Sequence, residues 1–261
     1  MRGLDAARLR QMLEDLPWTV EVADCLDSTN GELKRRAREG LATGTVLLAR
    51  QQTGGRGRLG RQFASPAGGI YLSVLLRPRA HLMRLTAVTA AAVCRAVREV
   101  CGAEPAVKWR NDLLLNGKKL CGILAEVSFA QGQVDYAVVG VGLNCNTDPA
   151  DLPPELRETA TSLRQSQGHP VDETALTAAL IRALYAMDAA LPAGAEAWMA
   201  EYAAACITVG QPVRLLRGAE SADAFAVGLD ADGGLIVRDE HGKTAVIDTG
   251  EVSVRGLNGY I

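Results

Sequence analysis

The chain has 261 residues, of which 48% are hydrophobic, and it carries a net charge of −2 with a pI of about 6.0. This length suits one large domain or a domain with a small appendage. The nearly balanced charge argues against a general nucleic-acid binder, which would be more basic. The three histidines, His81, His169 and His241, are scattered and show no metal-ligand spacing.

The N-terminal segment and the cysteines favour a cytoplasmic protein without a membrane partner. Residues 1–16 are amphipathic and charged, unlike a signal peptide, and no run approaches the roughly 18 apolar residues of a membrane span. The six cysteines show no CxxC and no regular pattern, so we expect buried free thiols in a reducing compartment.

The first part of the chain alternates predicted helices and strands. Apolar residues at helical spacing predict a short helix over residues 4–16, and "DSTN" (27–30) supplies cap residues before a second helix that stops at Gly40. The next elements are a buried strand over 45–50, the segment "QQTGGRGRLGRQF" over 51–63, a strand over 70–77 and an Ala-rich helix from about residue 81 to residue 100. We call residues 51–63 the Gly/Arg loop.

A hairpin opens the second part of the chain, because Asn116-Gly117 between apolar runs is a strong two-residue turn signal. The elements expected next are a strand over 135–144 after a turn at Gly132, an irregular connection over 145–170, and helices over 172–191 and 193–205.

The pattern changes near Cys206 to short strands at close spacing. Turns at Asp232-Gly233 and His241-Gly242 separate them. This pattern predicts a small β-barrel appended to the main domain. The predicted domains are therefore residues 1–205 and 206–261.

The Gly/Arg loop combines backbone freedom with fixed positive charge. Successive glycine N–H groups can form a concave anion nest, and arginines supply planar cations for a phosphate or carboxylate. Arg56, Arg58 and Arg61 alternate with the glycines, which suits a loop that is mobile when empty and ordered when an anion is bound. A solvated surface loop is an equally open interpretation. The loop is not a Walker A motif, because no GK[ST] follows.

Lys108 lies in "KWRNDLLLNGKKLCGILAEV", where we expect it to open a strand that carries Trp109 and ends near Asn111-Asp112. A lysine on a strand between apolar runs is commonly an edge or snorkelling residue. However, only five of the 28 basic residues are lysines, and three of them fall at positions 108, 118 and 119. The use of lysine at these positions, in a chain that mostly uses arginine, indicates a need for a compact ammonium. Lys34, by contrast, is expected on the exposed face of the second helix.

Two further segments carry polar side chains at the ends of elements. Ser28, Thr29 and Asn30 gather hydroxyls and an amide at a helix start, which capping alone would explain and which a polar ligand would also suit. Asn144 ends a buried strand in "VGVGLNCN", either as a turn residue or as a ligand contact.

Taken together and in this order, the segments resemble the biotin protein ligases. The resemblance rests on "DSTN", "QTGGRGRLGR", "SPAGGIYLSVLLRP", "KWRNDLLLNGKKLCGILAEV" and "VGVGLNCN", with "ATSL" (160–163) and the C-terminal strands in agreement. It covers nearly the whole chain. Arg110 departs from the family pattern, since it stands where the KWPND motif has proline. Only about twenty residues precede the catalytic region, too few for the winged-helix repressor domain of some members.

The resemblance implies a mixed-sheet α/β catalytic domain like that of class II aminoacyl-tRNA synthetases, followed by an SH3-like barrel. It also implies an ATP-dependent ligase with biotin and ATP as substrates and Mg²⁺ as cofactor. Biotin would be activated to biotinyl-5′-AMP and transferred to a lysine of a biotin carboxyl carrier protein, as in acetyl-CoA carboxylase. No specific DNA binding is expected. A homodimer paired through edge strands stays open, and the metal ligands are not indicated.

The resemblance also assigns site residues. The biotin contacts would be Ser28, Thr29, Asn30, Gln52, Arg56, Gly57, Arg58 and Lys108. The nucleotide contacts would be Arg56, Arg58, Arg61, Asp112, Lys119, Gly122, Asn144 and Tyr202, the last as an adenine-stacking ring. Lys108 and Arg58 would act in catalysis, with Lys108 between the biotin carboxylate and the α-phosphate.

Two other functions are weighed against this one. A lipoate or octanoate ligase or transferase shares the fold group, although "GRGRLGR" favours biotin. A nucleic-acid-binding regulator belongs to a different class. The pI and the missing winged helix speak against it, and salt-dependent DNA binding would reveal it.

Overall fold

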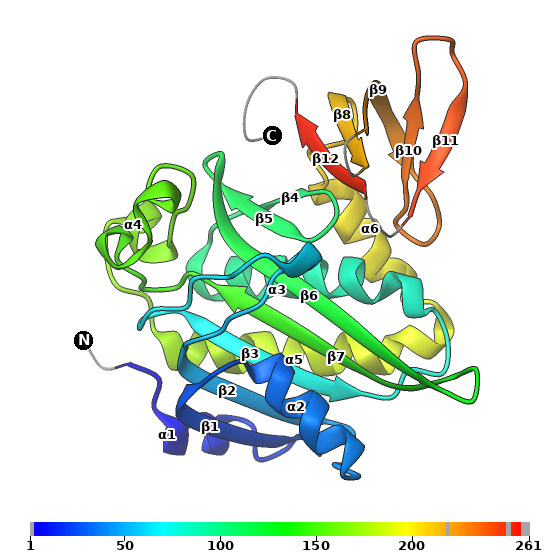
Figure 1. Ribbon diagram of the computed structural model, residues 1–261. Helices are drawn as coiled ribbons and strands as arrows, with labels where there is room; N and C mark the ends of the chain where they lie inside the picture. The colour runs from blue at the N-terminus through cyan, green and yellow to red at the C-terminus, as the bar shows by residue number, and fades with distance from the viewer. Residues whose placement is uncertain (1–2, 218–219, 249–251, 257–261) are drawn as a thin grey trace.

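Two β-sheets organise the chain in the computed structural model, which describes residues 3–217, 220–248 and 252–256 (Figure 1). The larger sheet contains β1 (Thr19–Leu26), β2 (Thr45–Gln52), β3 (Ile70–Leu76), β4 (Ala106–Lys108), β5 (Asp112–Leu115), β6 (Lys118–Ala130) and β7 (Gln133–Leu143). Their spatial order is β1-β2-β3-β7-β6-β5-β4. β1 and β2 run parallel, and the other neighbouring strands are antiparallel. This mixed sheet confirms the predicted α/β class.

Helices cover the two faces of this sheet unequally. They are α1 (Ala6–Met12), α2 (Thr29–Arg38), α3 (Leu85–Cys101), α4 (Leu163–Gln167), α5 (Glu173–Ala190) and α6 (Glu196–Ala205). α3 and α5 pack side by side behind the sheet, whereas α2 lies across its front (Figure 1). The main hydrophobic core fills the rear layer. The front therefore keeps room for a site.

The helix α5 is an apolar helix of that core. By length and composition the stretch Glu173–Ala193 could cross a membrane, so the expectation that no run approaches such a span was wrong. In the fold, however, 61% of its most apolar window is buried, because α5 packs against α3 and the back of the sheet. Core packing therefore accounts for the apolar composition.

The front face of the sheet divides into a filled half and a hollow half. Leu33 and Ala37 of α2 pack onto Leu47, Leu75 and Val138, which fills the first half. Successive strand residues point to opposite faces, so the alternation in β6 and β7 places Gly122, Gly140 and Gly142 toward the front. These glycines leave a hollow where larger side chains would have filled the surface.

The predicted turns are confirmed by the backbone. Asn116 and Gly117 join β5 to β6 with φ angles of 53° and 75°, the left-handed pair that a tight hairpin needs. The helix after "DSTN" is also confirmed, with Ser28 as N-cap. β1 and β12 (Val252–Gly256) were not predicted, and α4 lies in a connection expected to be irregular. Lys108 was placed wrongly, because it ends β4 and pairs with Asp112 across a tight turn.

The C-terminal module, predicted as a small β-barrel of short strands, is an antiparallel sheet. It contains β8 (Pro212–Arg217), β9 (Glu220–Leu229), β10 (Leu235–Arg238), β11 (Thr244–Ile247) and β12 (Val252–Gly256), in the order β11-β10-β9-β8-β12. The predicted boundary after residue 205 falls where α6 ends and stays a prediction. The last predicted residues, 257–261, lie outside the described part of the chain.

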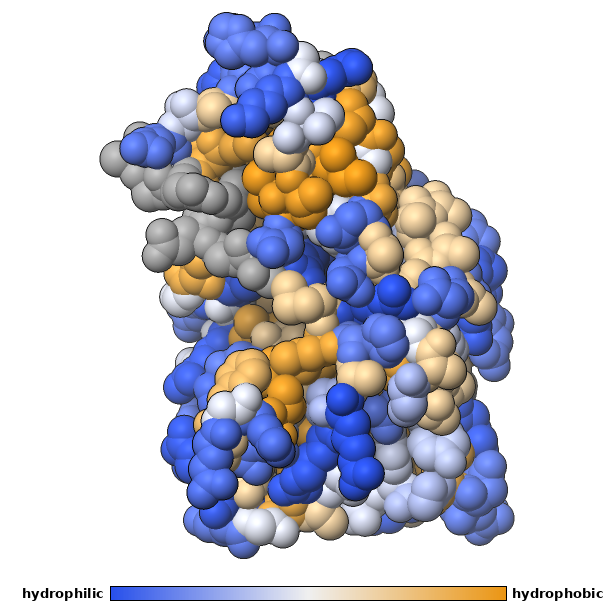
Figure 2. All heavy atoms as spheres, turned by 90° about the vertical axis from the view of Figure 1, so that its right-hand side faces the viewer, coloured by the Kyte–Doolittle hydropathy of each residue, from blue (hydrophilic) through white to orange (hydrophobic). Residues whose placement is uncertain are grey.

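Buried hydrogen bonds join this module to the main sheet at the Lys108 end. The indole Nε1 of Trp109 donates to the Gly233 carbonyl at 2.9 Å, and the Ile207 amide donates to the Val107 carbonyl at 3.0 Å. Seen from the module side, apolar side chains gather on the upper part of the molecule (Figure 2). The module thus abuts the strand end that carries Lys108.

The cysteines mostly match the expectation of buried free thiols. All six are free; Cys94, Cys121, Cys145 and Cys206 are buried and Cys101 is half-buried. Cys25 is the exception. It lies on the edge strand β1 and is exposed, so the prediction was wrong for this thiol.

Candidate active site

A cavity of about 310 Å³ opens on the hollow half of the sheet. This size lies at the lower end of typical small-molecule sites. Its walls are the start of α2, the Gly/Arg loop, β6, β7 and the β4–β5 strand end. Every predicted site residue except Tyr202 lines it: Ser28, Thr29, Asn30, Gln52, Arg56, Gly57, Arg58, Arg61, Lys108, Asp112, Lys119, Gly122 and Asn144. The fold therefore brings four separate motifs to one place.

The floor begins at the first turn of α2. Ser28 caps the helix, and its hydroxyl accepts a hydrogen bond from the Gly31 amide at 3.3 Å. The Thr29 amide donates to Gln52 Oε1 at 2.9 Å, and the Thr29 hydroxyl oxygen lies 3.2 Å from the same acceptor. These bonds connect the helix start to the strand that leads into the Gly/Arg loop. Capping and ligand contact are thus compatible roles for the same residues.

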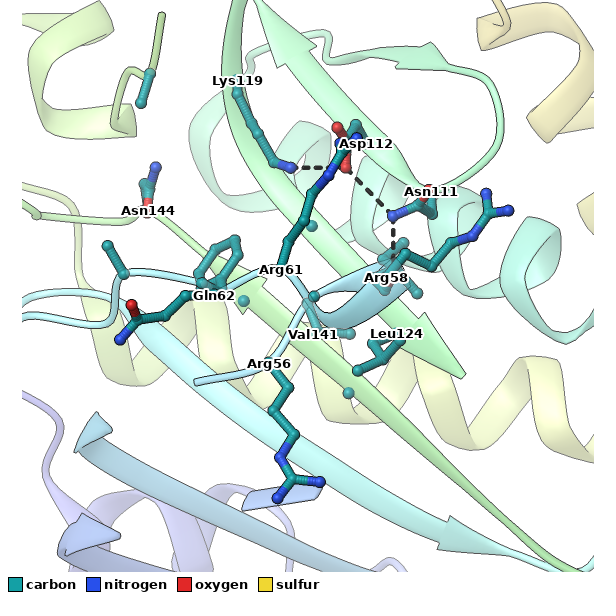
Figure 3. Close-up of a pocket in the computed structure, with 18 of the residues that line it drawn as sticks. Arg56, Arg58, Arg61, Gln62, Asn111, Asp112, Lys119, Leu124, Val141 and Asn144 are labelled. Carbon is teal, nitrogen blue, oxygen red and sulfur yellow. Dashed lines mark hydrogen bonds and ion pairs between the residues drawn. The ribbon is translucent and has the colours of Figure 1, made fainter. Parts of the chain in front are cut away.

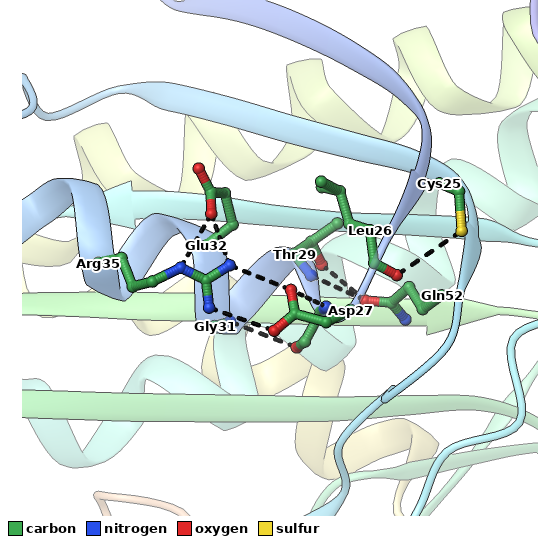
Figure 4. Close-up of polar contacts among 9 residues, drawn as sticks. Cys25, Leu26, Asp27, Thr29, Gly31, Glu32, Arg35 and Gln52 are labelled. Atoms are coloured by element: carbon green, nitrogen blue, oxygen red, sulfur yellow. Dashed lines mark hydrogen bonds and ion pairs between the residues drawn. The ribbon is translucent and has the colours of Figure 1, made fainter.

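An ion pair outside the cavity holds the same turn in place (Figure 4). The Arg35 guanidinium reaches both carboxylate oxygens of Asp27, at 3.2 and 3.1 Å, and also bonds to Glu32. Asp27 in turn accepts from the Ser28 amide at 2.7 Å. The Arg35 hydrogen bond holds the pKa of Asp27 below its ordinary value. The carboxylate therefore stays charged and keeps the turn fixed.

Asn30 continues the floor over the glycines of β7. Its side chain is buried, with 4% exposed. A Cβ at Gly140 would overlap the Asn30 carboxamide, so this close approach requires glycine. Ser73 of β3 lies within 2.5 Å of Asn30 Oδ1 and 2.7 Å of the Thr29 hydroxyl. Ser73 was not among the predicted residues, because a serine inside an apolar strand gives little signal.

The Gly/Arg loop folds as an irregular hairpin across the cavity. The Gly57 amide donates to the Arg61 carbonyl at 2.7 Å and the Phe63 amide donates to the Gly55 carbonyl at 2.9 Å. The three arginines diverge from this hairpin, with Arg58 directed toward the strand end that carries Asn111 (Figure 3). These backbone hydrogen bonds hold the base of the hairpin. Ordering of the loop on ligand binding stays a prediction.

Positive charge dominates the lining of the cavity. Five cations are among the described lining residues (Arg56, Arg58, Arg61, Lys108 and Lys119), against the single carboxylate of Asp112. Lys119 Nζ lies 2.8 Å from Asp112 Oδ1, so that carboxylate is already paired. Burial, together with the neighbouring Arg110 charge, lowers the pKa of Arg58. Such an excess of cations suits an anionic ligand.

Lys108 is buried, with 7% exposed, and lines the cavity from the end of β4. β4 is an edge strand of the sheet, which agrees with the interpretation of Lys108 as an edge residue. A snorkelling lysine would carry its ammonium out to solvent, which this degree of burial contradicts. The placement therefore favours a functional ammonium.

Arg110, the residue at the family's proline position, turns away from the cavity. Its guanidinium donates to the Met83 carbonyl at 2.6 Å and to the Asp248 carbonyl in the C-terminal module. Burial lowers its pKa. The departure from proline thus adds a link between the strand end and the module while Lys108, Asn111 and Asp112 keep their places in the cavity.

Asn144 carries a buried acceptor at the far wall. Its amide nitrogen donates to the Thr161 carbonyl at 3.0 Å. Its Oδ1 has no hydrogen-bond partner among the described residues, although the side chain is only 5% exposed. An unpartnered buried acceptor is costly, so a ligand donor at this place would recover that cost. This observation favours ligand contact over a simple turn role.

Tyr202 is the predicted site residue that the structure does not bring to the cavity. It is completely buried in the core, and its hydroxyl donates to the Arg110 carbonyl at 3.2 Å. A ring without exposed surface has no face for a ligand to stack on. The adenine-stacking role that the resemblance implied is therefore withdrawn.

Several lining residues were missed by the sequence reading. Phe63 of the Gly/Arg loop packs its ring over Gly122 and Gly142, where an added Cβ would meet it. Leu124 and Val141 also line the cavity. The alternation of glycine with apolar residues in "CGIL" and "VGVG" was the available signal, since period-two glycines leave one face of a strand bare.

The described residues contain no group of three or more His, Cys, Asp or Glu side chains able to hold a metal ion. A magnesium ion commonly binds through one or two carboxylates together with substrate phosphates. Asp112 could supply one such carboxylate. The cavity therefore fits a metal that arrives with a nucleotide better than a metal held by the protein alone.

Comparison with known proteins agrees with this geometry. The Biotin/lipoate A/B protein ligase family matches residues 22–144, and the Biotin protein ligase C terminal domain matches residues 208–255. A biotin--[acetyl-CoA-carboxylase] ligase of Paracoccus denitrificans is 34% identical over 247 residues, which cover 88% of this chain and 98% of that protein. A solved biotin protein ligase of Aquifex aeolicus in complex with biotin and ATP superposes with a TM-score of 0.80 at 29% identity, covering 91% of this chain and 99% of that chain.

Another relative has a different length. The Bacillus subtilis bifunctional ligase/repressor BirA is 39% identical over 153 residues, covering 57% of this chain and 47% of that protein. The match thus spans about half the length of that relative. Fold, cavity and comparisons define a protein of the biotin/lipoate ligase class. Within it, the chain belongs to the biotin protein ligase family.

Proposed function

We propose that this chain is an ATP-dependent biotin protein ligase, which forms biotinyl-5′-AMP and transfers biotin to a lysine of a carboxyl carrier protein. The observation that supports this most is that one cavity combines a hydrogen-bonding floor at the start of α2 with five lining cations against a single carboxylate. Biotin has a polar ureido ring at one end and a carboxylate at the other. A ligand of that kind places each group against a complementary surface.

The same floor argues against lipoate and octanoate. Ser28, Thr29 and Asn30 are at most 4% exposed, so an apolar ligand end would cover polar groups without bonding to them. Sites built for hydrogen bonding reject ligands that lack the matching groups by about 10⁴–10⁵-fold. Octanoyl and lipoyl chains lack a ureido group, so we expect biotin to be strongly preferred.

The first step joins two anions. A biotin carboxylate oxygen attacks the α-phosphorus of ATP, a P–O bond to the β-phosphate breaks, and pyrophosphate leaves. Like charges about 4 Å apart repel by roughly 4 kcal/mol at an effective dielectric constant of 20. Lys108 would lie between the carboxylate and the α-phosphate, where a compact ammonium can donate to both. Its burial at the strand end strengthens such an interaction.

The arginines would offset the remaining charge. Arg58, with Arg56 and Gly57, would contact the biotin carboxylate and the phosphates, and Arg61 would face the nucleotide. Closure of the loop over the adenylate would exclude water, which would otherwise hydrolyse the mixed anhydride. No covalent enzyme nucleophile is needed, because both nucleophiles belong to substrates.

Asp112, Lys119, Gly122 and Asn144 would form the nucleotide side. The unpartnered Asn144 Oδ1 would accept a hydrogen bond from the nucleotide. Mg²⁺ would supply positive charge to the phosphates, and Asp112, whose Oδ1 is paired with Lys119, would be the lining carboxylate able to contact it. Gly122 leaves room for the Phe63 ring at this wall of the cavity, because a side chain there would meet Phe63.

In the second step a neutral lysine amine of the carrier would attack the anhydride carbonyl. The bond to the phosphate oxygen breaks, AMP leaves, and the amine loses a proton as the amide forms. The acceptor would be the biotin-accepting domain of a carboxylase, which the name of the Paracoccus relative supports. A cytoplasmic location and a homodimer paired through edge strands remain predictions.

Exchange of labelled pyrophosphate into ATP tests the proposal. Biotin, lipoate and octanoate are supplied one at a time to the wild-type chain. We expect exchange with biotin and little with the other two acids. Exchange driven by lipoate or octanoate would assign the alternative ligase. Absence of exchange with all three, joined to salt-dependent DNA binding, would favour the nucleic-acid-binding regulator.

A further inference from the structure

A continuous line of hydrogen bonds runs beneath the cavity floor and ends at an ion pair outside it. Lys34 Nζ of α2 lies 2.5 Å from Glu126 Oε1 of β6. The other carboxylate oxygen of Glu126 accepts from Asn30 Nδ2 at 2.9 Å. The sequence reading had placed Lys34 on an exposed face, and this contact shows that the expectation was wrong. Neither Lys34 nor Glu126 lines the cavity.

Glu126 reaches the floor because of the strand alternation. Gly122, Leu124 and Glu126 of β6 share the front face. The first two line the cavity, and Glu126 follows them beside α2. Its carboxylate is about one quarter exposed, at 25%, and Lys34 at 27%. The pair thus lies at the border between the floor and solvent.

The carboxylate fixes which way the Asn30 amide points. Burial would raise the pKa of Glu126, but hydrogen bonds from Lys34 and Asn30 outweigh burial and keep the pKa below its ordinary value. An ionised carboxylate can only accept hydrogen bonds. The Leu124 carbonyl, 3.3 Å from the same Asn30 nitrogen, also only accepts. Asn30 must therefore direct its NH₂ group at these two acceptors and its oxygen at Ser73.

The orientation of Asn30 passes on to two hydroxyls. Ser73 has one proton to donate and lies near two acceptors, Asn30 Oδ1 at 2.5 Å and Thr29 Oγ1 at 2.7 Å. With the Asn30 oxygen facing it, Ser73 donates to Asn30 and is left to accept from Thr29. If the amide were reversed, Ser73 would accept a hydrogen bond from the Asn30 NH₂ group and donate its own proton to Thr29 instead. The Thr29 proton would then be displaced toward Gln52 or the ligand.

We infer that Glu126, held by Lys34, is a positioning residue that sets the donor and acceptor pattern of Asn30, Ser73 and Thr29 on the floor. The inference rests on the proposed function, because it takes the ligand on that floor to be the ureido end of biotin. That ring presents both N–H donors and a carbonyl acceptor. If the Asn30 amide were reversed, the floor would present donors to some of the ring's donors, or acceptors to its acceptor.

The test is a pair of substitutions that exchanges the amide of Asn30 and the carboxylate of Glu126. Glu126→Gln introduces an NH₂ group that can face Asn30, so the amide loses its fixed orientation. We expect the KM for biotin in pyrophosphate exchange to rise about tenfold, since a hydrogen bond to a charged group is commonly worth that much. The kcat and the KM for ATP should stay within about twofold. Asn30→Asp, which places two carboxylates face to face, should raise the KM for biotin at least as much.

The double variant with Asn30→Asp and Glu126→Gln decides between positioning and general damage. In it the new amide at position 126 would donate to the new carboxylate at position 30, and that carboxylate would again present an oxygen to Ser73. We expect the double variant to recover biotin affinity relative to Asn30→Asp by about tenfold, a non-additive effect that simple loss of packing would not give. Glu39→Gln, the same change at the exposed end of α2, serves as the control. Lys34→Met should have a smaller effect, within about threefold, because this pair is partly exposed.

Titration calorimetry with biotin gives a second readout that does not depend on catalysis. If the wild-type chain neither binds biotin nor catalyses exchange, the proposed function fails and this inference falls with it. If the wild-type chain is active but Glu126→Gln binds biotin within twofold of it, the inference alone is overturned. Failure of the double variant to recover, in a protein that melts like the wild type, would overturn it equally.

Discussion

The two ends of the cavity are built in opposite ways. At the α2 end, Ser28, Thr29 and Asn30 are 2%, 4% and 4% exposed and bond to neighbouring protein groups. At the loop end, Arg56 and Arg61 are exposed and Arg58 also lines the cavity, whose lining as a whole has five cations against one carboxylate. The floor is therefore organised by the protein itself, whereas the loop end carries a surplus of positive charge that an anion would balance.

This contrast suggests a division of labour between selection and chemistry. A floor whose hydrogen bonds are fixed in advance binds without reorganisation and discriminates by matching groups. A cationic end acts where negative charge gathers during the reaction. Changes at the floor should therefore alter the KM for biotin, and changes at the loop end should alter the rate of adenylation.

The largest expected effect is at Lys108. Lys108→Arg keeps the charge, but a planar guanidinium cannot place one donor between two oxygens as an ammonium can. Losing an interaction aimed at transition-state charge costs about 2.7–4 kcal/mol, or on the order of 10²–10³ in rate. The variant should fold normally. In single-turnover assays we expect it to form biotinyl-AMP at least about a hundredfold more slowly than the wild type.

The matched control is Lys243→Arg, at an exposed turn of the C-terminal module. Lys34 would not serve as a control, since it is bonded to Glu126. The control should match the wild type. A Lys108→Arg enzyme within a few-fold of the wild type would falsify the bridging role and leave Lys108 as a structural residue.

A smaller effect is expected for a change at the floor, Gly140→Ala. The added Cβ would overlap the Asn30 carboxamide, which must then move. We expect the KM for biotin to rise about tenfold while the KM for ATP changes little, because overpacking a fixed site typically costs about 1–3 kcal/mol. Gly228→Ala on β9, where the new methyl meets only Ile236 at 3.9 Å, is the control. An equal rise in both KM values would argue against separate ends.

The loop end should respond to ligands as a unit. Arg56 and Arg61 are exposed on a hairpin whose tip includes Leu59 and Gly60 with left-handed backbone. Biotin with ATP should slow trypsin cleavage after the loop arginines by about tenfold, because proteolysis follows the population of the open form. Cleavage after Lys243 should not change. Equal loop cleavage with and without ligands would contradict ordering on binding.

The smallest effect is expected at Tyr202. Tyr202→Phe removes a hydroxyl bonded to the Arg110 carbonyl at 3.2 Å within the core. We expect a loss of about 1 kcal/mol in the free energy of unfolding, and a KM for ATP within twofold of the wild type. Denaturant unfolding and pyrophosphate exchange measure the two quantities. A large rise in the KM for ATP would restore Tyr202 to the nucleotide site.

Much of the fold could be predicted from strong local patterns in the sequence. Asn116-Gly117, the caps of α2 and the apolar runs of β2, β3 and β7 depend on neighbours in the chain, and the structure confirms them. The edge strands β1 and β12 and the short strand β4 gave weaker patterns. Edge and very short strands obtain their form from pairing with distant residues, which the local sequence does not contain.

The sequence by itself determined the site chemistry, because each motif requires particular residue types in a short stretch: glycines and arginines in the loop, lysine at 108, and hydroxyls and an amide at 28–30. Only the tertiary structure decided which side chains meet. It buried Tyr202 in the core, hollowed the sheet at Gly140 and Gly142, and joined Lys34 to Glu126 beneath Asn30. These outcomes depend on strand register and helix placement, which arise from packing between segments about a hundred residues apart, such as Lys34 and Glu126 at a separation of 92.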